Sequence, residues 1–533
     1  MTASEKPDYV IEFQQTKPPR TEIKKIGNRW YLYERFCKYD PEIKRTRKIS
    51  GKCLGAITPN GLVKTTRRLA EQKPVALNDV VGAGNEIYFW ENTSSMRERL
   101  RKYFPELWQR IYAAVYVRAV LDPRFRRLQP HYENSLFSYI FPSLSFQRPD
   151  IRNLLEELGK SRGAIRGYMR EDLADREAFI LFDGHRILSA SKGMTTAELG
   201  YDSKCRYKPQ INLVYVFSLG EETGMPLYYK QYVGSTPDVS CFSDLLRETA
   251  MTERNYTVIA DKGFASEDGF SQLDDDGLKY LLPLKRNCAI AEGLMPKSHT
   301  GYSKSFTYHS RSIQYSSFDV ENDTAKLHIY FDPELHSDEM ATATARMEER
   351  NCGIEKERQA EKKRREKGKG KLSDSELEAL KPVELSDIYA AHPAMGVIII
   401  KTNRLDLEGE AVYYIYKQRQ NIEQFFKTYS ETLDFEASYM RGATQEEAWL
   451  FLNHLAAGFC VRTIEEIYSV GEDKNISYKD LTSGLEKIRA ARIEEAWQIP
   501  PVKRSTAKLC EKLGISITPE KIKSLISEAA SRT

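Results

Sequence analysis

The sequence predicts an α/β protein whose sheet carries aspartates at strand ends. Two short apolar runs, at residues 178–183 and 256–263, contain Asp183 and Asp261 next to or near a glycine. Such runs are typical of buried strands, and the C-terminal edge of an open sheet is where ligands bind. A third stretch, residues 411–430, contains no Gly or Pro and has apolar residues at helical spacing, which predicts a helix.

Composition restricts the class of protein. No apolar run approaches the roughly 20 residues of a membrane span, and the first 15 residues lack the pattern of a signal peptide. Eight dispersed cysteines form no C-x-x-C pair, which argues against a zinc knuckle or a disulfide framework. We therefore expect a soluble protein of the cytoplasm without membrane contact.

The charge is unevenly distributed. Residues 1–150 hold 27 Lys plus Arg against 16 Asp plus Glu, whereas the whole chain has a net charge of only +4. A basic N-terminal part favours binding to a phosphate backbone, although a merely solvated basic surface gives the same count.

The N-terminal third is expected to contain a β-rich module, residues 1–100, and a helical DNA-binding region, residues 101–175. The first 20 residues look like a flexible lead. Strands are predicted at 29–36 and 48–57, followed by a turn at 59–61. Helices are predicted at 105–121, 150–158 and 163–173, and the first of them is followed by Arg124, Arg126 and Arg127.

The catalytic core is expected at residues 176–285 and 393–470, interrupted by a β-strand insertion at 286–392. Its predicted elements are strands ending at 182 and covering 211–218, 227–233, 258–260, 280–284 and 398–401, with a helix at 240–252 and a long apolar helix at 446–468. The insertion should contain strands at 305–316, 317–320 and 326–331. Its charged segment, residues 348–371, is either a projecting helix or disordered. Residues 471–533 should form a C-terminal helical region.

The helix at 411–430 places Tyr416, Arg419, Glu423 and Lys427 on one face. Together with Asp183 and Asp261, Glu423 gives three carboxylates that could meet at one edge of the sheet. Carboxylates lie close together only when a cation or a proton neutralises them, and oxygen ligands beside phosphate chemistry favour Mg²⁺, with Mn²⁺ as a substitute.

The motifs FILFDGHRI, VIADKGF and YKQRQNIEQFF together resemble DDE transposases of the "insertion sequence four" superfamily. That family has a tyrosine–arginine–glutamate–lysine signature, which Tyr416, Arg419 and Glu423 match in spacing. The family's lysine position is Ser430 here, and Lys427, one turn after Glu423, is a candidate replacement. The resemblance extends over roughly residues 100–470.

This resemblance implies a ribonuclease H-like core in which Asp183, Asp261 and Glu423 hold two metal ions, with Asp183 bridging them. It implies cleavage at transposon ends and strand transfer into target DNA, with Tyr416 and Arg419 steadying a distorted strand. The implied partners are double-stranded DNA, as terminal inverted repeats and target, and a second copy of the chain. The implied location is the prokaryotic cytoplasm, in association with the nucleoid.

Three other functions are compatible with these motifs. The chain could be a ribonuclease H-like nuclease that cuts without strand transfer, or a catalytically silent DNA-binding protein descended from a transposase. A metal-independent hydrolase is a third, although the sequence has no G-x-S-x-G motif and no recognisable Cys–His nucleophile signature.

Overall fold

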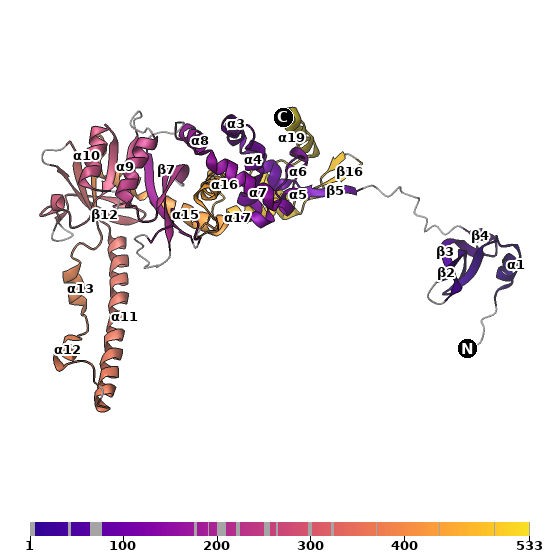
Figure 1. The fold of residues 1–533 in the computed structure, drawn as a ribbon, viewed down its shortest axis with the longest axis horizontal. Helices are drawn as coiled ribbons and strands as arrows, with labels where there is room; N and C mark the ends of the chain where they lie inside the picture. The colour runs from indigo at the N-terminus through magenta and orange to yellow at the C-terminus, as the bar shows by residue number, and fades with distance from the viewer. Residues whose placement is uncertain are drawn as a thin grey trace. The chain divides into compact units, whose positions relative to one another are not determined.

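The computed structural model describes residues 6–40, 44–63, 77–174, 179–189, 191–199, 209–219, 224–249, 256–262, 265–296, 301–320, 324–368, 370–435, 437–494 and 496–531. The chain divides into two compact units (Figure 1). One consists of residues 1–79 with 491–496, and the other of residues 80–490 with 497–533. In the part of the chain that is described, no helix is both long and apolar enough to cross a membrane.

The first unit is a small antiparallel sheet with one helix. Its elements are α1 (Asp8–Thr16), β1 (Thr21–Ile26), β2 (Arg29–Asp40), β3 (Arg45–Thr58) and β4 (Gly61–Val63). The strands pair in sequence order, and Val10 of α1 packs with Trp30, Leu32 and Ile57. The prediction of a flexible lead is therefore wrong for residues 8–16, because Val10, with Tyr9 and Phe13 beside it, packs this short helix on the sheet. Trp30 belongs to that core.

The second unit begins with helices. They are α2 (Gly84–Glu91), α3 (Ser94–Tyr103), α4 (Trp108–Tyr116), the π-helix η1 (Val117–Leu121), the 3₁₀ turn η2 (Phe125–Arg127), α5 (Leu128–Glu133), α6 (Phe137–Ile140), α7 (Arg148–Lys160) and α8 (Arg162–Ala174), preceded by β5 (Leu77–Gly82). The three predicted helices correspond to α4 with η1, α7 and α8. The helix predicted at 105–121 changes to π-helical hydrogen bonding after Tyr116.

A large mixed sheet follows. Its strands are β6 (Phe179–Ser189), β7 (Gln210–Leu219), β8 (Gly224–Val233), β9 (Thr257–Ala260), β10 (Lys279–Pro283), β11 (Lys304–Tyr308), β12 (Arg311–Asp319), β13 (Lys326–Phe331), β14 (Val397–Thr402) and β15 (Ala437–Ser438). The order is β11-β12-β13-β14-β10-β9-β6-β7-β8, with β15 beside β6. The helices α9 (Asp238–Thr249) and α10 (Glu267–Asp275) lie between strands in the sequence, and η4 (Ala289–Ala291) is a 3₁₀ turn after β10.

The sheet contains both parallel and antiparallel strand pairs. The strands β6, β9 and β10 are parallel neighbours, so their C-terminal ends meet at one edge. The other long pairs are antiparallel: β6 with β7, β7 with β8, β10 with β14, and the insertion strands among themselves. The predicted insertion is therefore continuous with the central sheet through β13 and β14.

The prediction of one continuous strand at 305–316 is wrong, because this segment contains a turn. The chain turns back at His309 and Ser310, which both have positive φ, so β11 and β12 form a hairpin. Adjacent positive φ values are required by the two-residue turns that match strand twist. Neither residue is a glycine, which is why the turn left no signal in the sequence.

The rest of the chain is helical, apart from two short strands that include residues assigned to the first unit. Its elements are α11 (Pro333–Glu366), α12 (Asp374–Ala379), α13 (Leu385–Ala391), α14 (Gly409–Lys417), α15 (Gln420–Leu433), α16 (Ala443–Ser469), α17 (Tyr478–Leu485), β16 (Arg489–Ile493), β17 (Ala496–Gln498), α18 (Arg504–Lys512) and α19 (Pro519–Ser531). The charged segment 348–371 is thus largely helical, as the second half of α11, which extends away from the sheet (Figure 1).

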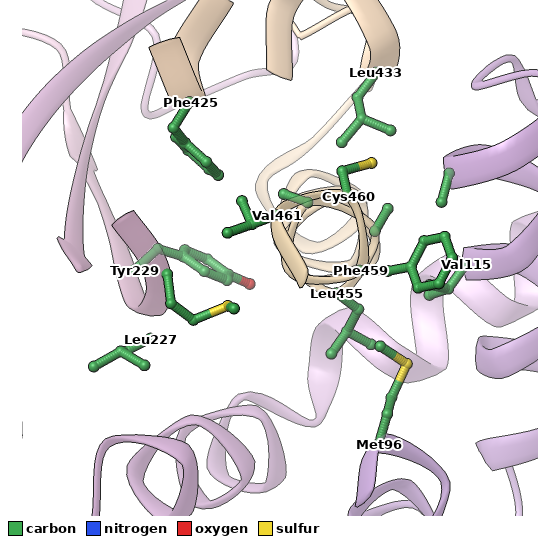
Figure 2. Close-up of a cluster of buried hydrophobic side chains, with 14 of the residues drawn as sticks. Met96, Val115, Leu227, Tyr229, Phe425, Leu433, Leu455, Phe459, Cys460 and Val461 are labelled. Carbon is green, nitrogen blue, oxygen red and sulfur yellow. The ribbon is translucent and has the colours of Figure 1, made fainter. Parts of the chain in front are cut away.

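The helix α16 is the centre of the core. It contacts α4, α7, α15 and β8, and its side chains are buried on all sides. Figure 2 looks along this helix, with Phe459 beside Val115 and, on another side, Val461 near Phe425. Its His454 is buried and stacks on Tyr215, and desolvation lowers the pKa of His454 to about 4. The predicted long core helix and its packed histidine are therefore confirmed.

Candidate functional site

Asp183 lies inside β6, at the point where parallel pairing with β9 ends and antiparallel pairing with β7 continues. The predicted strand ended there, but β6 continues to Ser189 because its second half pairs antiparallel with β7. Parallel pairing with β9 does stop at this point, and its last pair is Phe182 with Ala260. Asp183 is half-buried, and its Oδ1 accepts a hydrogen bond from the Gly184 amide at 2.9 Å.

Asp261 follows directly after β9, as predicted. Since Phe182 and Ala260 are in register, Asp183 and Asp261 take up equivalent positions on adjacent parallel strands. Their backbones are therefore separated by about the inter-strand distance, roughly 5 Å. Both carboxylates lie near enough to Arg419 to raise its pKa. The side chain of Asp261 is 41% exposed, and its Oδ1 accepts from the Lys262 amide at 2.7 Å. The two predicted aspartates are thus brought together.

Arg419 joins this pair from a distant part of the chain. Its Nη1 donates to Asp261 Oδ1 at 2.6 Å, and its guanidinium lies 5.7 Å from the centre of the Tyr416 ring. Burial alone would lower the pKa of Arg419. The neighbouring Tyr416 and the charges of Asp261 and Asp183 outweigh burial and raise that pKa above its usual value. Arg419 therefore carries a fixed positive charge at the two aspartates.

The predicted helix 411–430 is two helices, α14 and α15, with a joint at residues 418–419. At the joint, backbone hydrogen bonds span three residues: Arg419 N donates to Tyr416 O, and Ile422 N to Arg419 O. This tighter winding rotates α15 relative to α14, so the four signature positions do not share one continuous helical face. Glu423 and Lys427 lie on α15, in its first and second turns, and their side chains are outside the described residues.

A recess of about 600 Å³ opens beside Asp261. It is bounded by β10, β14, the first turns of α11 and the α14–α15 joint, and its basic lining residues are Lys262, Lys285, Arg286, Lys417 and Arg419. Arg286 pairs with Glu339 of α11 at 2.8 Å. The recess is therefore lined by five basic side chains and two carboxylates, Asp261 and Glu339.

The family model for the transposase DDE domain matches residues 176–459, more than half of the chain. The chain belongs to this transposase family. Among solved structures, it is similar to a piggyBac transposase described as a synaptic complex with hairpin DNA. The likeness covers 79% of this chain and 76% of that one, at 12% identity and a TM-score of 0.38. No curated protein matches the sequence.

The matched span of the transposase contains both aspartates, Glu423 and the α14–α15 joint. Transposases of this type generally use divalent metal ions, and the residues at the sheet edge fit such an ion. Asp183 and Asp261 offer oxygen ligands from adjacent strands, and Asp261 is partly exposed. Asp183 and Asp261 could hold such an ion. Glu423 lies in the first turn of α15, and Arg419, just before that helix, contacts Asp261.

The recess residues Lys262, Lys285 and Arg286 were not predicted from the sequence. A signal for two of them existed, because Lys285 and Arg286 follow directly after the apolar strand β10, which is parallel to β9. Basic residues after such a strand belong to the same edge as Asp261. Lys417, beside the signature tyrosine, was also missed.

Lys417 faces a buried carboxylate rather than the aspartate pair. Its Nζ lies 3.1 Å from Asp332 Oδ2, and Tyr413 donates its hydroxyl to the same oxygen at 2.6 Å. Arg311 of β12 lies 3.1 Å from Asp332 Oδ1. Burial alone would raise the pKa of Asp332, but these partners outweigh it and hold that pKa below its usual value. Asp332 therefore fastens α11 to α14.

The predicted DNA-binding arginines after α4 are placed apart from the recess. Arg124 donates to Asp122 at 2.6 and 2.8 Å, so that it stabilises the turn after η1. Arg126 and Arg127 are exposed on η2. None of the three lines the recess.

Proposed function

We propose that this transposase cuts DNA at transposon ends and joins the freed 3′-hydroxyl to target DNA. We further propose that it belongs to the "insertion sequence four" superfamily and that its core is ribonuclease H-like. The observation that carries the proposal is the meeting of Asp183, Asp261 and Arg419 at one sheet edge, with Glu423 one turn further along the chain from Arg419.

In this proposal, Asp183, Asp261 and Glu423 hold Mg²⁺ or Mn²⁺. Bound divalent ions supply Lewis-acid activation of the attacking oxygen and charge stabilisation of the leaving oxygen. The chain itself positions the DNA. Arg419, whose charge is fixed by its neighbours, and Lys262, next to Asp261, orient the phosphate to be cut. Tyr416, beneath the guanidinium, supports Arg419 in that position.

The proposed substrate is double-stranded DNA, comprising terminal inverted repeats and target. The basic first unit and the exposed Arg126 and Arg127 are candidates for backbone contacts outside the active site, with Arg124 as a lesser one because Asp122 already neutralises it. Lys427 on α15 is a candidate replacement for the signature lysine. The domain limits predicted from the sequence, a dimer on paired ends and a prokaryotic, nucleoid-associated setting are parts of the same proposal.

The test is cleavage of DNA that carries the repeats flanking this gene. Asp183→Asn, Asp261→Asn and Glu423→Gln should each abolish Mg²⁺-dependent cleavage while end binding persists, because the affinity comes mainly from basic residues. Asp268→Asn, which changes an exposed aspartate on α10, is the matched control and should cut normally.

Three outcomes would overturn parts of the proposal. Cleavage retained in any one carboxylate variant removes that residue from the site. A protein that cuts but cannot join a pre-cut end to plasmid DNA is a nuclease without strand transfer. A wild-type chain that binds ends and never cuts is a silent DNA-binding protein.

A further inference from the structure

The charged segment of the insertion is built as a long helical hairpin, here called the arm (α11, α12 and α13). The helix α11 has 34 residues and is therefore about 50 Å long. The chain then returns along it through α12 and α13 (Figure 1). Asn351 of α11 and Val383 of the returning segment exchange two hydrogen bonds, at 2.9 and 2.8 Å. The arm is thus an ordered structure rather than a loose surface loop.

The base of the arm is joined to α14 by an ion pair. Asp332 caps the start of α11 by accepting from the amides of Glu334 and Leu335. The same carboxylate forms an ion pair with Lys417 of α14, the residue that follows Tyr416. Because Asp332 is fully buried, these contacts are dry and specific. The direction of the arm is therefore fixed relative to α14.

The far end of the arm, here called the tip (residues 356–371), is held by its own carboxylate. Glu361 is buried, and its Oε1 accepts from the amides of Lys371 and Leu372 at 2.6 and 3.0 Å. Arg365 pairs with Asp374 of α12 and donates to Leu372 O at 2.8 Å. The carboxylate of Glu361 is thus buried against the backbone amides of the turn and is not exposed on the surface of the tip.

The tip is the most concentrated positive charge on the arm. Nine Lys plus Arg stand against three Glu over residues 356–371, a net charge of +6. Lys356, Arg358, Lys362, Lys363 and Lys367 are all exposed. Within the described residues, no carboxylate lies at ion-pair distance from Lys362, Lys363 or Lys367.

Helix stability accounts for only part of this charge. Lys363, Arg364 and Arg365 lie in the last turn of α11, where cations interact favourably with the helix dipole. Lys356, Arg358 and Lys362 lie outside that last turn, where the effect has fallen off.

The acidic residues of the returning segment offset the tip only in part. Residues 372–391 hold five carboxylates against one lysine, a net charge of −4, compared with +6 for the tip. Asp374 is paired with Arg365, and Glu376 holds the Ser373 amide in a capping box. Asp387 likewise holds the Glu384 amide at 2.9 Å. A net charge of +2 remains over residues 356–391, and the exposed ammonium groups of Lys362, Lys363 and Lys367 lie at its far end.

We propose that the tip is a second DNA contact, which binds the phosphate backbone of a duplex outside the active site. The inference rests on the proposed function. From Asp332 to Lys363 the helix covers about 45 Å, the length of roughly 13 base pairs. Flexible lysines with no fixed partner suit a phosphate backbone, which is read by charge and not by sequence. The arm thus sets a distance between the cutting site and a second DNA segment.

The experiment measures DNA affinity of the full-length protein against salt concentration, without divalent metal so that no cutting occurs. The variant is Lys362→Gln, Lys363→Gln and Lys367→Gln combined. The matched control is Lys479→Gln, Lys487→Gln and Lys508→Gln, three exposed lysines outside the arm. Duplexes of about 10 base pairs, too short to span the arm, and of about 50 base pairs are compared, and thermal midpoints check that both variants fold.

On the long duplex, the tip variant should lower the slope of log affinity against log salt by about 2 to 3, since each lost phosphate contact removes about 0.9. The short duplex should show little change with the tip variant, and the control should change neither. An unchanged slope on the long duplex overturns the proposal, as does an equal loss in the control. Unchanged DNA affinity with loss of protein self-association would assign the tip to a protein contact instead.

Cleavage of the long duplex, measured separately with Mg²⁺, distinguishes this proposal from the function on which it rests. Normal cutting together with an unchanged salt slope contradicts only the role of the tip. Absence of cutting in the wild-type protein contradicts the proposed function, whatever the slope.

Discussion

Arg419 Nη1 lies 2.6 Å from Asp261 Oδ1, in a direct ion pair between the α14–α15 joint and the end of β9. The two residues are 158 positions apart in the sequence. Their contact brings the Glu423-bearing helix to the edge where the two aspartates lie. If Asp261 holds the metal as proposed, a guanidinium and a divalent cation compete for the same carboxylate.

Arg419→Gln is predicted to raise the affinity for metal and to lower the rate of cleavage. Removing the guanidinium frees Asp261, so affinity for Ca²⁺ or Mg²⁺ should rise, by at most about fivefold because the pair is partly exposed. Cleavage should fall by about 100-fold, since a charged donor to the phosphate is lost. Calorimetric titration of the metal and the cleavage assay measure the two effects.

Arg404→Gln is the matched control for that experiment. Arg404 pairs with Asp406 at 2.7 Å and donates to Thr257, at the opposite end of β9. Its loss should leave metal affinity unchanged. Weaker metal binding in Arg419→Gln would contradict the competition and make Arg419 a support of the metal site.

Deleting residues 1–63 is predicted to weaken DNA binding without unfolding the rest. The segment carries 13 Lys plus Arg against 7 Asp plus Glu, and the second unit has its own core. Affinity for end DNA and its salt slope should both decrease. Filter binding at several salt concentrations measures this. An unaltered slope, with an unaltered preference for end over random DNA, would place recognition in the second unit.

The deletion is a better test than an isolated fragment of residues 1–170. The helices between residues 84 and 170 pack on α16, which such a fragment would lack. Loss of binding by that fragment could then reflect unfolding.

Glu446 is predicted to make the protein less stable as pH rises from 4.5 to 7. Desolvation raises the pKa of Glu446 to about 7 in the folded protein, against 4.5 when it is exposed. Over this interval the unfolded chain releases a proton that the folded chain retains, so the free energy of unfolding decreases with pH, and the loss is complete above pH 7. Ser438, which donates to Glu446, does not outweigh burial.

Glu446→Gln removes this titration. Relative to wild type, the variant should gain stability between pH 5 and pH 8, by roughly 2–3 kcal/mol. Denaturant titrations at several pH values measure the difference. Glu86, whose pKa burial also raises to about 7, is present in both proteins and cancels. A difference independent of pH would mean that Glu446 is ionised in the fold.

Two protomers are predicted on paired transposon ends. Concerted cutting and joining of two ends needs two active sites held together, most simply by twofold symmetry. Light scattering of the assembled complex should give the mass of two chains with two DNA ends. Insertion of both ends by a single protomer would contradict the dimer. Deleting residues 356–371 without loss of assembly would leave the helices after residue 471 as the candidate interface.

Local sequence pattern was sufficient for most strands and for the core helix. The runs that became β7, β8, β9, β10, β13 and β14 are apolar and bounded by turn residues, so each had a strong local signal. Three elements were missed or misjudged for a common reason. The helix α1, the hairpin turn at His309 and Ser310 and the joint at residues 418–419 depend on contacts or dihedral angles that no local composition marks.

The sequence by itself determined which residues could carry the chemistry: two aspartates on apolar strands, and a helical segment with a tyrosine, an arginine and a glutamate at fixed spacing. Tertiary structure alone decided how they meet. Parallel pairing of β6 with β9 sets Asp183 beside Asp261, and the joint before α15 directs Arg419 to them. Tertiary packing also places Lys417 next to Asp332, and this ion pair connects the arm to α14. Strand register and helix winding are set by long-range packing, because a shift of one residue would reverse the face of every side chain without altering the local pattern.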